Sequence, residues 1–379
     1  MRLRHAPVGG GAALEILVTY SLALRPSAPA LRRPQRLILK VEGEQVADVE
    51  YRPDHADLAP FARLERMSYS ELAEAASGCC PSCSIAHALA LCQAIEALAA
   101  VQLPPRAAYL RLAAAELERA ASHLATLAAL FGALALPYLA EACAAQASAT
   151  RTILTRLAGS APAAWIVPAG LARDISPGEV TVLWSAATIL EQLFPLAEQT
   201  IARRSLLART VEIGVISAGA AEQFRLAGPL ARAAGLSADL RRDAPYAAYA
   251  DLTPGLVTQE GGDVHARMVV LLLEALEALR LVERVARALP DGPVGASLPD
   301  ELPAGAASAA VEAPRGPLRY DVESDGRWLS AVNVRCAPQL DRLLARAVLA
   351  NAALDDAALI VVSTDPCDAC LAVSSDQLA

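Results

Sequence analysis

Two cysteine pairs near opposite ends of the chain place the strongest constraint on its fold. The first pair is Cys80 and Cys83, and the second is Cys367 and Cys370. Thiolates are the ligands that hold nickel, iron, zinc or cuprous copper. Because 284 positions separate Cys83 from Cys367, no local zinc ribbon can use both pairs. If the pairs meet, the fold must return the last segment of the chain to an early helix.

The alternative is that the pairs are unrelated. One Cys-x-x-Cys is also the spacing of redox motifs, and two such pairs can arise by chance in a chain with eight cysteines. The flanking residues argue against this alternative. Both segments resemble the large subunit of nickel–iron hydrogenases, above all the membrane-bound, energy-converting branch that is related to the quinone-site subunit of respiratory complex I. The matching residues are Cys80, Cys83, Ser84, His87, Ala88, Asp365, Pro366, Cys367 and Cys370.

Further segments match the same family in the same order. Four segments fall where the family has them. They are Arg-Asp-Ile at 173–175, the Gly, Pro, Arg, Asp and Tyr residues between 228 and 249, Gly-Asp at 262–263 and Glu-Ala-Pro-Arg-Gly at 312–316. Glu116, Arg119 and His123 fit the family's Glu-Leu-x-Arg-x-x-x-His, whose charges lie inside a helical bundle. From spacing alone, an exposed polar stripe is nearly as good an interpretation. The resemblance covers the chain from about residue 29 to its end.

The resemblance implies a metal site. Four thiolates, from Cys80, Cys83, Cys367 and Cys370, are expected to hold a nickel–iron centre whose iron carries CO and CN ligands. Arg315 is expected to lean over the metal and meet these ligands. His87 follows Cys83 by four residues and so shares its helix face, where it is expected to donate a hydrogen bond to a thiolate or a metal-bound ligand. The plainer interpretation of His87 is a satisfied buried histidine.

Several departures from the family bear on activity. Arg33 stands where relatives have a glutamate that passes protons to the metal, and a guanidinium stays protonated at neutral pH. The alternative interpretation of Arg33 is a plain surface arginine. Pro81 replaces a glycine, which removes a backbone N–H and stiffens the loop. Val373 stands where many precursors have the Arg or His at which they are trimmed. These changes predict altered proton handling.

Three functions compete. The favoured one is the large subunit of an energy-converting nickel–iron hydrogenase or complex-I-like oxidoreductase, because all four cysteines and the later signatures are kept. The second is a maturation scaffold, similar to HupK-type formation proteins, that holds only the iron fragment with its CN and CO ligands. The third is a subunit that works on quinone. It is the weakest, because that lineage has lost the cysteines.

Composition and charge limit the possible partners and the cellular location. A net charge of −8 argues against nucleic acid as a partner. No signal peptide is recognised, since glycines at 9–11 interrupt the segment after the basic start, so the predicted location is cytoplasmic. The stretch 120–140 has no charged residue and is long enough to span a bilayer. Because His123 and Pro137 interrupt it, it is interpreted as a buried helix, and no membrane span is predicted.

The resemblance also implies partners. They are an iron–sulfur small subunit, membrane-arm subunits and a maturation chaperone. Through them the chain is expected to be peripheral on the inner face of the membrane.

The predicted fold is mainly α, a long-helix bundle of the nickel–iron hydrogenase large-subunit type with small β-hairpins near both ends. With 55% hydrophobic and 4% aromatic residues, the chain can bury a large helical core. No composition break divides it, so one domain is predicted over 1–379. That domain comprises an N-terminal β region at 1–60, a helical bundle at 61–290 and a C-terminal α+β segment at 311–379. Residues 178–209 are expected to form one helix, residues 290–310 a loop, and residues 358–362 a strand.

Overall fold

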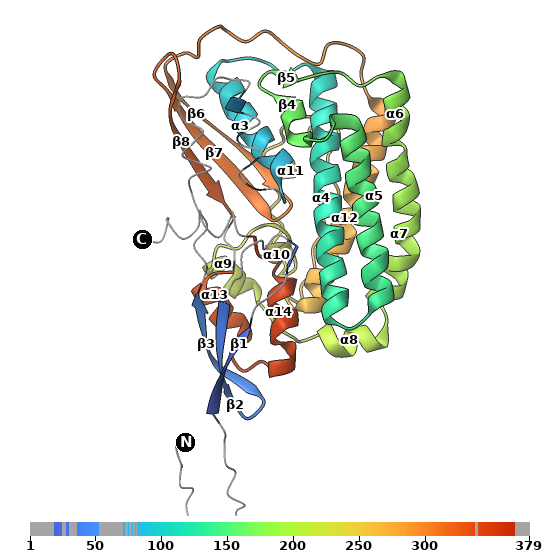
Figure 1. Ribbon diagram of the computed structural model, residues 1–379, viewed down its shortest axis with the longest axis vertical. Coiled ribbons are helices and arrows are strands. Elements are labelled where there is room, and N and C mark those ends of the chain that lie inside the picture. Colours follow the sequence, from blue (N-terminus) through green and yellow to red (C-terminus); the bar gives the residue numbers. More distant parts are fainter. Residues whose placement is uncertain are drawn as a thin grey trace, which may run out of the picture.

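The computed structural model describes residues 19–24, 28–29, 36–52, 71–72, 75, 78, 80, 82–337 and 340–367. Its body consists of long helices that lie side by side in Figure 1. They are α4 (Pro105–Ala133), α5 (Pro137–Ala158), α7 (Ser185–Ile201) and α12 (Val264–Ala288). Helix α4 packs against both α5 and α12, and α12 packs against α7. The mainly helical class is therefore confirmed in its coarse form.

The helix bounds follow local signals in the sequence. Proline occupies the first turn of α4 and of α5, where its missing N–H costs nothing. The Asp263 side chain caps α12 by accepting a hydrogen bond from the Ala266 N–H at 2.7 Å. α3 (Ser84–Leu98) begins directly after Cys83, which is its N-cap residue. Shorter helices complete the body: α9 (Ala218–Gln223), α10 (Gly228–Arg232), α11 (Leu240–Asp243) and α13 (Arg342–Leu349).

The segment 178–209 was expected as one helix, and this prediction is wrong. It forms α6 (Pro177–Leu183), α7 and α8 (Arg204–Thr210). Ser176 and Glu179 make a capping box that starts α6. The chain leaves regular helix again at Ala202 and Arg203, so that α8 turns away from α7.

Three small antiparallel sheets flank the helices. The first contains β1 (Thr19–Leu24), β2 (Arg36–Glu42) and β3 (Gln45–Arg52), and its predicted β2–β3 hairpin is confirmed. A two-stranded sheet joins β4 (Ile166–Val167) to β5 (Gly170–Leu171). The third contains β6 (Gly305–Ala313), β7 (Gly316–Ser324) and β8 (Leu329–Cys336), and α3 packs against its first two strands.

Two predictions for the C-terminal third are wrong. Residues 305–310 were expected in a loop but belong to β6, which pairs with β7 along its whole length. Their Gly, Ala and Ser residues lack strand propensity, so the pairing specifies the strand. Residues 358–362 were expected as a strand but belong to α14 (Ala357–Ser363). A short apolar run does not distinguish a strand from a buried helix, and this run packs against α4, α12 and α13.

The uncharged stretch 120–140 does not form one helix. It is divided between α4 and α5 by a turn at Ala135, whose φ is +57°. A different stretch, Pro177–Ile201, is long and apolar enough to cross a membrane by length and composition, and 44% of its 18-residue apolar window is buried in the fold. Buried helices of globular proteins meet the same criteria.

Candidate metal centre

Three of the four expected cysteine ligands converge. The Sγ atoms of Cys80 and Cys83 lie 3.1 Å apart, and those of Cys80 and Cys367 lie 3.6 Å apart. All three sulfurs lie within 4.8 Å of one another, and all three side chains are buried. The fourth expected ligand, Cys370, lies outside the described residues, as do Arg33, Pro81 and Val373.

The three sulfurs fit a metal. Two sulfurs bound to one tetrahedral metal lie about 3.8 Å apart when each metal–sulfur bond is about 2.3 Å. The separations of 3.1 and 3.6 Å are slightly shorter, so small side-chain rotations would admit an ion. A set made only of thiols selects soft or borderline metals.

The start of α3 fixes Cys83. Its carbonyl accepts a hydrogen bond from the His87 N–H at 3.1 Å, and its own N–H bonds to the Cys80 carbonyl at 3.3 Å. A cysteine at the N-cap offers this helix no side-chain cap. Instead Glu118 of α4 accepts hydrogen bonds from the N–H groups of Ile85 and Ala86, at 2.8 and 3.0 Å. A carboxylate from a second helix thus satisfies the first turn of α3.

Arg315 lies in the tight turn between β6 and β7, and it is buried. Its Nε donates to the carbonyl of Asp365 at 3.1 Å, and its Nη2 donates to Oδ1 of the same residue at 3.0 Å. The burial of Arg315 would lower its pKa, but the charge of Asp365 outweighs it and raises the pKa above its ordinary value. The Nη1 atom is buried without a hydrogen-bond partner in the described part of the chain. The guanidinium therefore keeps one donor for a further group.

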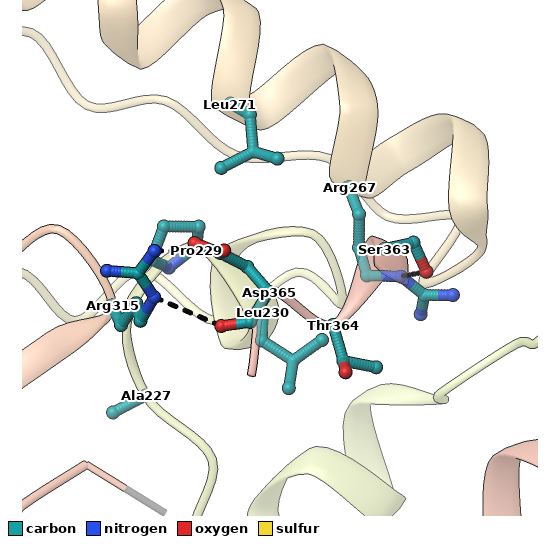
Figure 2. A pocket seen from close by; sticks show the side chains of 9 residues that line it. All are labelled: Ala227, Pro229, Leu230, Arg267, Leu271, Arg315, Ser363, Thr364 and Asp365. Carbon is teal, nitrogen blue, oxygen red and sulfur yellow. Dashed lines mark hydrogen bonds and ion pairs between the residues drawn. The ribbon is translucent and has the colours of Figure 1, made fainter. Parts of the chain in front are cut away.

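Arg315 contributes to the lining of two cavities. It shares one cavity with Asp365, Arg267, Ser363 and Thr364, and Figure 2 shows the Arg315–Asp365 ion pair at its edge. A second cavity is lined by Cys83, His87, Arg315 and Cys336. Arg315, which was expected to lie over the metal, thus lines the cavity that Cys83 also lines.

His87 lies on the first turn of α3 and shares that second cavity with Cys83. Its Nδ1 lies 2.7 Å from the Tyr320 hydroxyl of β7. Burial lowers the pKa of His87 to about 4, against the opposing charge of Cys367, so the imidazole is neutral at pH 7. Tyr320 thus holds a neutral ring beside the cavity that Cys83 also lines, a role that the sequence did not indicate.

The thiols of Cys80 and Cys83 are protonated when no metal is bound. The contact with Cys367 and burial raise the pKa of Cys80 above its ordinary value, and contacts with Cys367 and Cys80 raise the pKa of Cys83 well above its ordinary value. A cation must therefore displace protons from the thiols when it binds.

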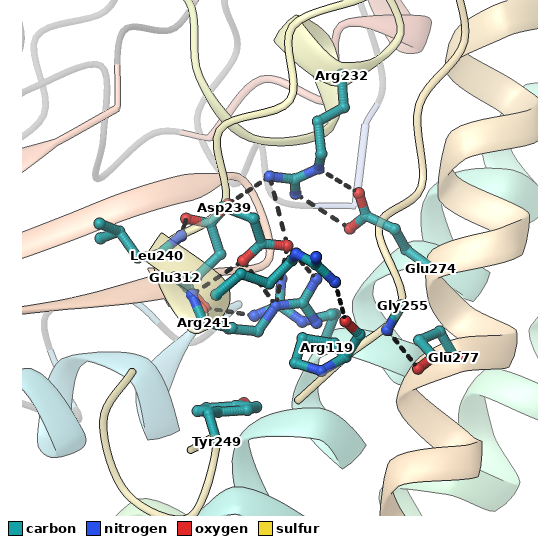
Figure 3. A network of polar contacts seen from close by, with 12 residues as sticks. Arg119, Arg232, Asp239, Leu240, Arg241, Tyr249, Gly255, Glu274, Glu277 and Glu312 are labelled. Atoms are coloured by element: carbon teal, nitrogen blue, oxygen red, sulfur yellow. Dashed lines mark hydrogen bonds and ion pairs between the residues drawn. The ribbon is translucent and has the colours of Figure 1, made fainter. Parts of the chain in front are cut away.

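The polar stripe of α4 is not exposed. Glu116, Arg119 and His123 are each at most 1% exposed, which favours the interpretation of charges inside a bundle. They belong to a buried charge cluster that consists of Glu116, Arg119, His123, Arg232, Asp239, Arg241, Glu274 and Glu312. Figure 3 shows six of its members: Arg119, Arg232, Asp239, Arg241, Glu274 and Glu312. Arg232 bonds Glu274 at 2.6 Å and Glu312 at 2.8 Å, and Arg241 bonds Asp239 at 2.6 Å.

The buried charge cluster extends to the metal site through α4. The Arg119 guanidinium donates to the carbonyls of Glu312 and Ala313, just before the turn that carries Arg315. Thr126, further along the same helix face, donates to Asp365 Oδ1 at 2.8 Å. Sequence reasoning missed the roles of Thr126, Glu118 and Tyr320. Helical spacing places Thr126 with Arg119 and His123, but nothing local points to its partner.

We expect Gly228→Ala to disturb the Arg315 turn. Gly228 has a φ of +65°, and a Cβ there would lie 2.6 Å from the Arg315 carbonyl oxygen. The strain and the clash together should cost about 1–3 kcal/mol. Gly219→Ala in α9 is the control, because its Cβ meets nothing within 4 Å and alanine favours helix. Urea unfolding midpoints measure both. Equal midpoints for the two variants would contradict the close approach.

Glu118 should make stability fall as the pH rises. Burial raises its pKa from 4.5 to about 7, although the Ile85 and Ala86 N–H groups oppose this. The folded state therefore binds the proton more tightly than the unfolded state. This contribution is complete below pH 4.5 and is lost as the pH rises through 7. At about 1.4 kcal/mol per pKa unit, the loss approaches about 3 kcal/mol.

Glu118→Gln cannot titrate, so it isolates this contribution. The unfolding free energy of the wild type minus that of Glu118→Gln should decrease between pH 4.5 and 7.5, measured by urea unfolding at each pH. Parallel curves for the two proteins would show that Glu118 does not gain a proton on folding.

Known proteins share this architecture. The solved structure of the membrane-bound sulfane sulfur reductase, an archaeal respiratory membrane complex, has a chain that superimposes with a TM-score of 0.84 at 23% identity, covering 95% of this chain and 100% of that one. The profile of the family described as "Respiratory-chain NADH dehydrogenase, 49 Kd subunit" matches residues 150–302. At 23% identity, the likeness to the reductase chain shows the fold alone.

Sequence relatives define the family. The carbon monoxide-induced hydrogenase of Rhodospirillum rubrum is 31% identical over 368 residues, which are 93% of this chain and 99% of that protein. An NADH-quinone oxidoreductase subunit of Salinispora arenicola is 33% identical, covering 86% of each chain. Formate hydrogenlyase subunit 5 of Escherichia coli is 27% identical, covering 89% of this chain and 60% of that protein.

The helical body with a buried cysteine cluster, together with these relatives, defines a complex-I-like subunit. The chain belongs to the nickel–iron hydrogenase large-subunit family, in the energy-converting branch that is related to the 49 kDa subunit of respiratory NADH dehydrogenase.

Proposed function

We propose that this chain is the large subunit of an energy-converting nickel–iron hydrogenase and holds a nickel–iron centre on Cys80, Cys83, Cys367 and Cys370. The observation that carries the proposal is the convergence of three buried sulfurs from opposite ends of the chain, all within 4.8 Å of one another. The two cysteine pairs are separated in sequence by the whole helical body, so only the folded chain can bring these sulfurs together. We accordingly assign the body to the bundle type of nickel–iron hydrogenase large subunits.

The surrounding residues suit such a centre. Arg315 has a buried, unsatisfied Nη1 in the described part of the chain, which can donate to a small anionic ligand such as cyanide. His87 is neutral and oriented by Tyr320 beside Cys83. When bound, the centre supplies the redox chemistry of splitting or forming H₂. The protein holds the ligands, excludes water and moves protons.

Proton movement is where this chain departs from its family. The arginine at position 33 cannot take the part of the glutamate expected there, because it stays protonated at neutral pH. Asp365 is a buried carboxylate two residues before Cys367, and Arg315 lies 3.0 Å from its Oδ1. We therefore propose an enzyme with altered proton handling and slow turnover.

The relatives also suggest the partners. Two are named as a hydrogenase or a hydrogenlyase subunit, and the chain with the same fold comes from a respiratory membrane complex. We propose that this chain is peripheral to a membrane, on its cytoplasmic face, and binds membrane-arm subunits, an iron–sulfur small subunit and a maturation chaperone.

Metal analysis with infrared spectroscopy tests the proposal. Protein purified anaerobically with its complex, from cells supplied with nickel and the maturation proteins, should contain nickel and iron and show CO and CN stretching bands. Iron with these bands but no nickel would replace the enzyme by the maturation scaffold. Zinc alone, or no metal at all, would overturn both functions.

A further inference from the structure

The backbone of Asp365 is strained just before the proposed ligand Cys367. Asp365 has a φ of +47°, in the left-handed region that residues other than glycine rarely adopt. It also precedes Pro366, whose ring restricts the backbone of the residue before it. A strained conformation of this kind persists only where the surrounding groups hold it. The contacts of Asp365 therefore determine the direction in which the chain reaches Cys367.

Two segments hold Asp365 in this conformation. From the turn between β6 and β7, Arg315 donates to its carbonyl oxygen at 3.1 Å and to its Oδ1 at 3.0 Å. From α4, the Thr126 hydroxyl donates to the same Oδ1 at 2.8 Å. Both Thr126 and Asp365 are buried, so bulk water does not compete for these bonds. The bond from Thr126 links the C-terminal ligand segment directly to α4.

Thr126 uses its hydroxyl differently from other buried helical threonines. A hydroxyl has one hydrogen to donate, and inside a helix it commonly goes to the carbonyl four residues earlier. The Thr126 oxygen lies 3.2 Å from that carbonyl, on Ser122, but 2.8 Å from the Asp365 carboxylate. Bonds to carboxylates are the stronger ones, so the hydrogen belongs to Asp365. Three threonines bond their own helix instead, at 2.6 to 2.8 Å: Thr150, Thr200 and Thr210.

The same helix also holds the Arg315 turn. Two helical turns before Thr126, on the same face of α4, Arg119 donates to the carbonyls of Glu312 and Ala313. These two residues lead directly into the turn that carries Arg315. α4 therefore holds Asp365 in two ways, directly through Thr126 and indirectly through the turn whose arginine bonds the same carboxylate.

We infer that Thr126 is a positioning residue of the cysteine site, whose hydroxyl holds Asp365 so that Cys367 meets Cys80 and Cys83. The inference rests on the metal centre of the proposed function. Without the hydroxyl, Asp365 keeps the flexible Arg315 side chain as its side-chain partner, and Cys367 is less firmly directed toward the other two sulfurs. A bound metal must then supply that restraint itself, which lowers its affinity. Groups that hold metal ligands in place typically contribute about 10–100-fold to metal affinity.

Cobalt(II) binding to the unloaded, reduced full chain tests this role. Bonds from thiolates to Co²⁺ give strong near-ultraviolet absorption, which reports how many sulfurs bind and how tightly. Thr126→Val has the same shape without the hydroxyl, and it should raise the dissociation constant of Co²⁺ about 10-fold. Thr126→Ser keeps the hydroxyl and should bind Co²⁺ close to the wild-type affinity.

Thr150→Val is the matched control. Thr150 is as fully buried as Thr126, but its hydroxyl donates to Gln146 in its own helix, α5. This variant should bind Co²⁺ like the wild type. Urea unfolding midpoints verify that all four proteins are folded before the metal is added.

Three results would overturn the inference alone. They are an unchanged affinity in Thr126→Val, a loss in Thr126→Ser as large as that in Thr126→Val, and an equal loss in Thr150→Val, which would make the effect one of helix stability. A wild-type chain without thiolate–cobalt bands would overturn the proposed metal centre, and this inference with it.

Discussion

Replacing Cys80 or Cys367 with serine should abolish the loading of nickel and iron. The Cys80 sulfur is the centre of the described cluster, 3.1 Å from that of Cys83 and 3.6 Å from that of Cys367. A serine hydroxyl is a hard, weakly acidic ligand and does not replace a thiolate toward a soft or borderline metal. Elemental analysis of the anaerobically purified complex should show metal contents near background, with no CO or CN bands.

Cys143→Ala is the matched control. Cys143 is fully buried in α5 and is not part of the sulfur cluster, so its loss should cost only packing energy. This variant should carry wild-type amounts of both metals. Equal metal contents in Cys80→Ser and Cys143→Ala would show that the cluster does not bind the metals, whatever the stability of the two proteins.

Arg241→Met should be among the most destabilising single substitutions in the chain. Arg241 is 2% exposed and bonds Asp239 at 2.6 Å and Glu116 at 3.2 Å. Removing the guanidinium leaves two buried carboxylates without their main counter-charge. Breaking a buried pair in this way costs about 3–5 kcal/mol. Urea unfolding of the unloaded full chain, followed by circular dichroism, should show a large decrease in the midpoint.

Arg319→Met provides the surface comparison. Arg319 bonds Asp321 at 2.7 Å on β7, but its side chain is 47% exposed, and Asp321 keeps Arg335 as a second partner. An exposed ion pair contributes about 0–1 kcal/mol, so this variant should unfold near the wild-type midpoint. If Arg241→Met unfolds at the same midpoint as Arg319→Met, the buried charge cluster does not hold the helices together.

Local signals in the sequence were enough for most helices. Prolines in the first turns of α4 and α5, and the Asp263 cap of α12, are chemical features of the segments themselves, and these helices begin at them. The hairpin of β2 and β3 likewise follows from alternation around Gly43, whose φ is +64°. Strand β6 and helix α14 were predicted wrongly, because their Ala-rich and short apolar sequences take their conformation from their neighbours.

The sequence by itself determined the chemical character of the site. Two cysteine pairs, a Glu-Ala-Pro-Arg-Gly turn and a histidine four residues after Cys83 were visible without coordinates, since motif chemistry depends on residue type and local spacing. Only the tertiary structure decided which distant groups meet. Arg315 forms an ion pair with Asp365, Thr126 of α4 donates a hydrogen bond to the same carboxylate, and Glu118 caps α3. These contacts join segments separated by 50, 239 and 33 positions, so no local pattern encodes them. Packing sets their distances, and burial together with the neighbouring charges and hydrogen bonds sets the resulting pKa values.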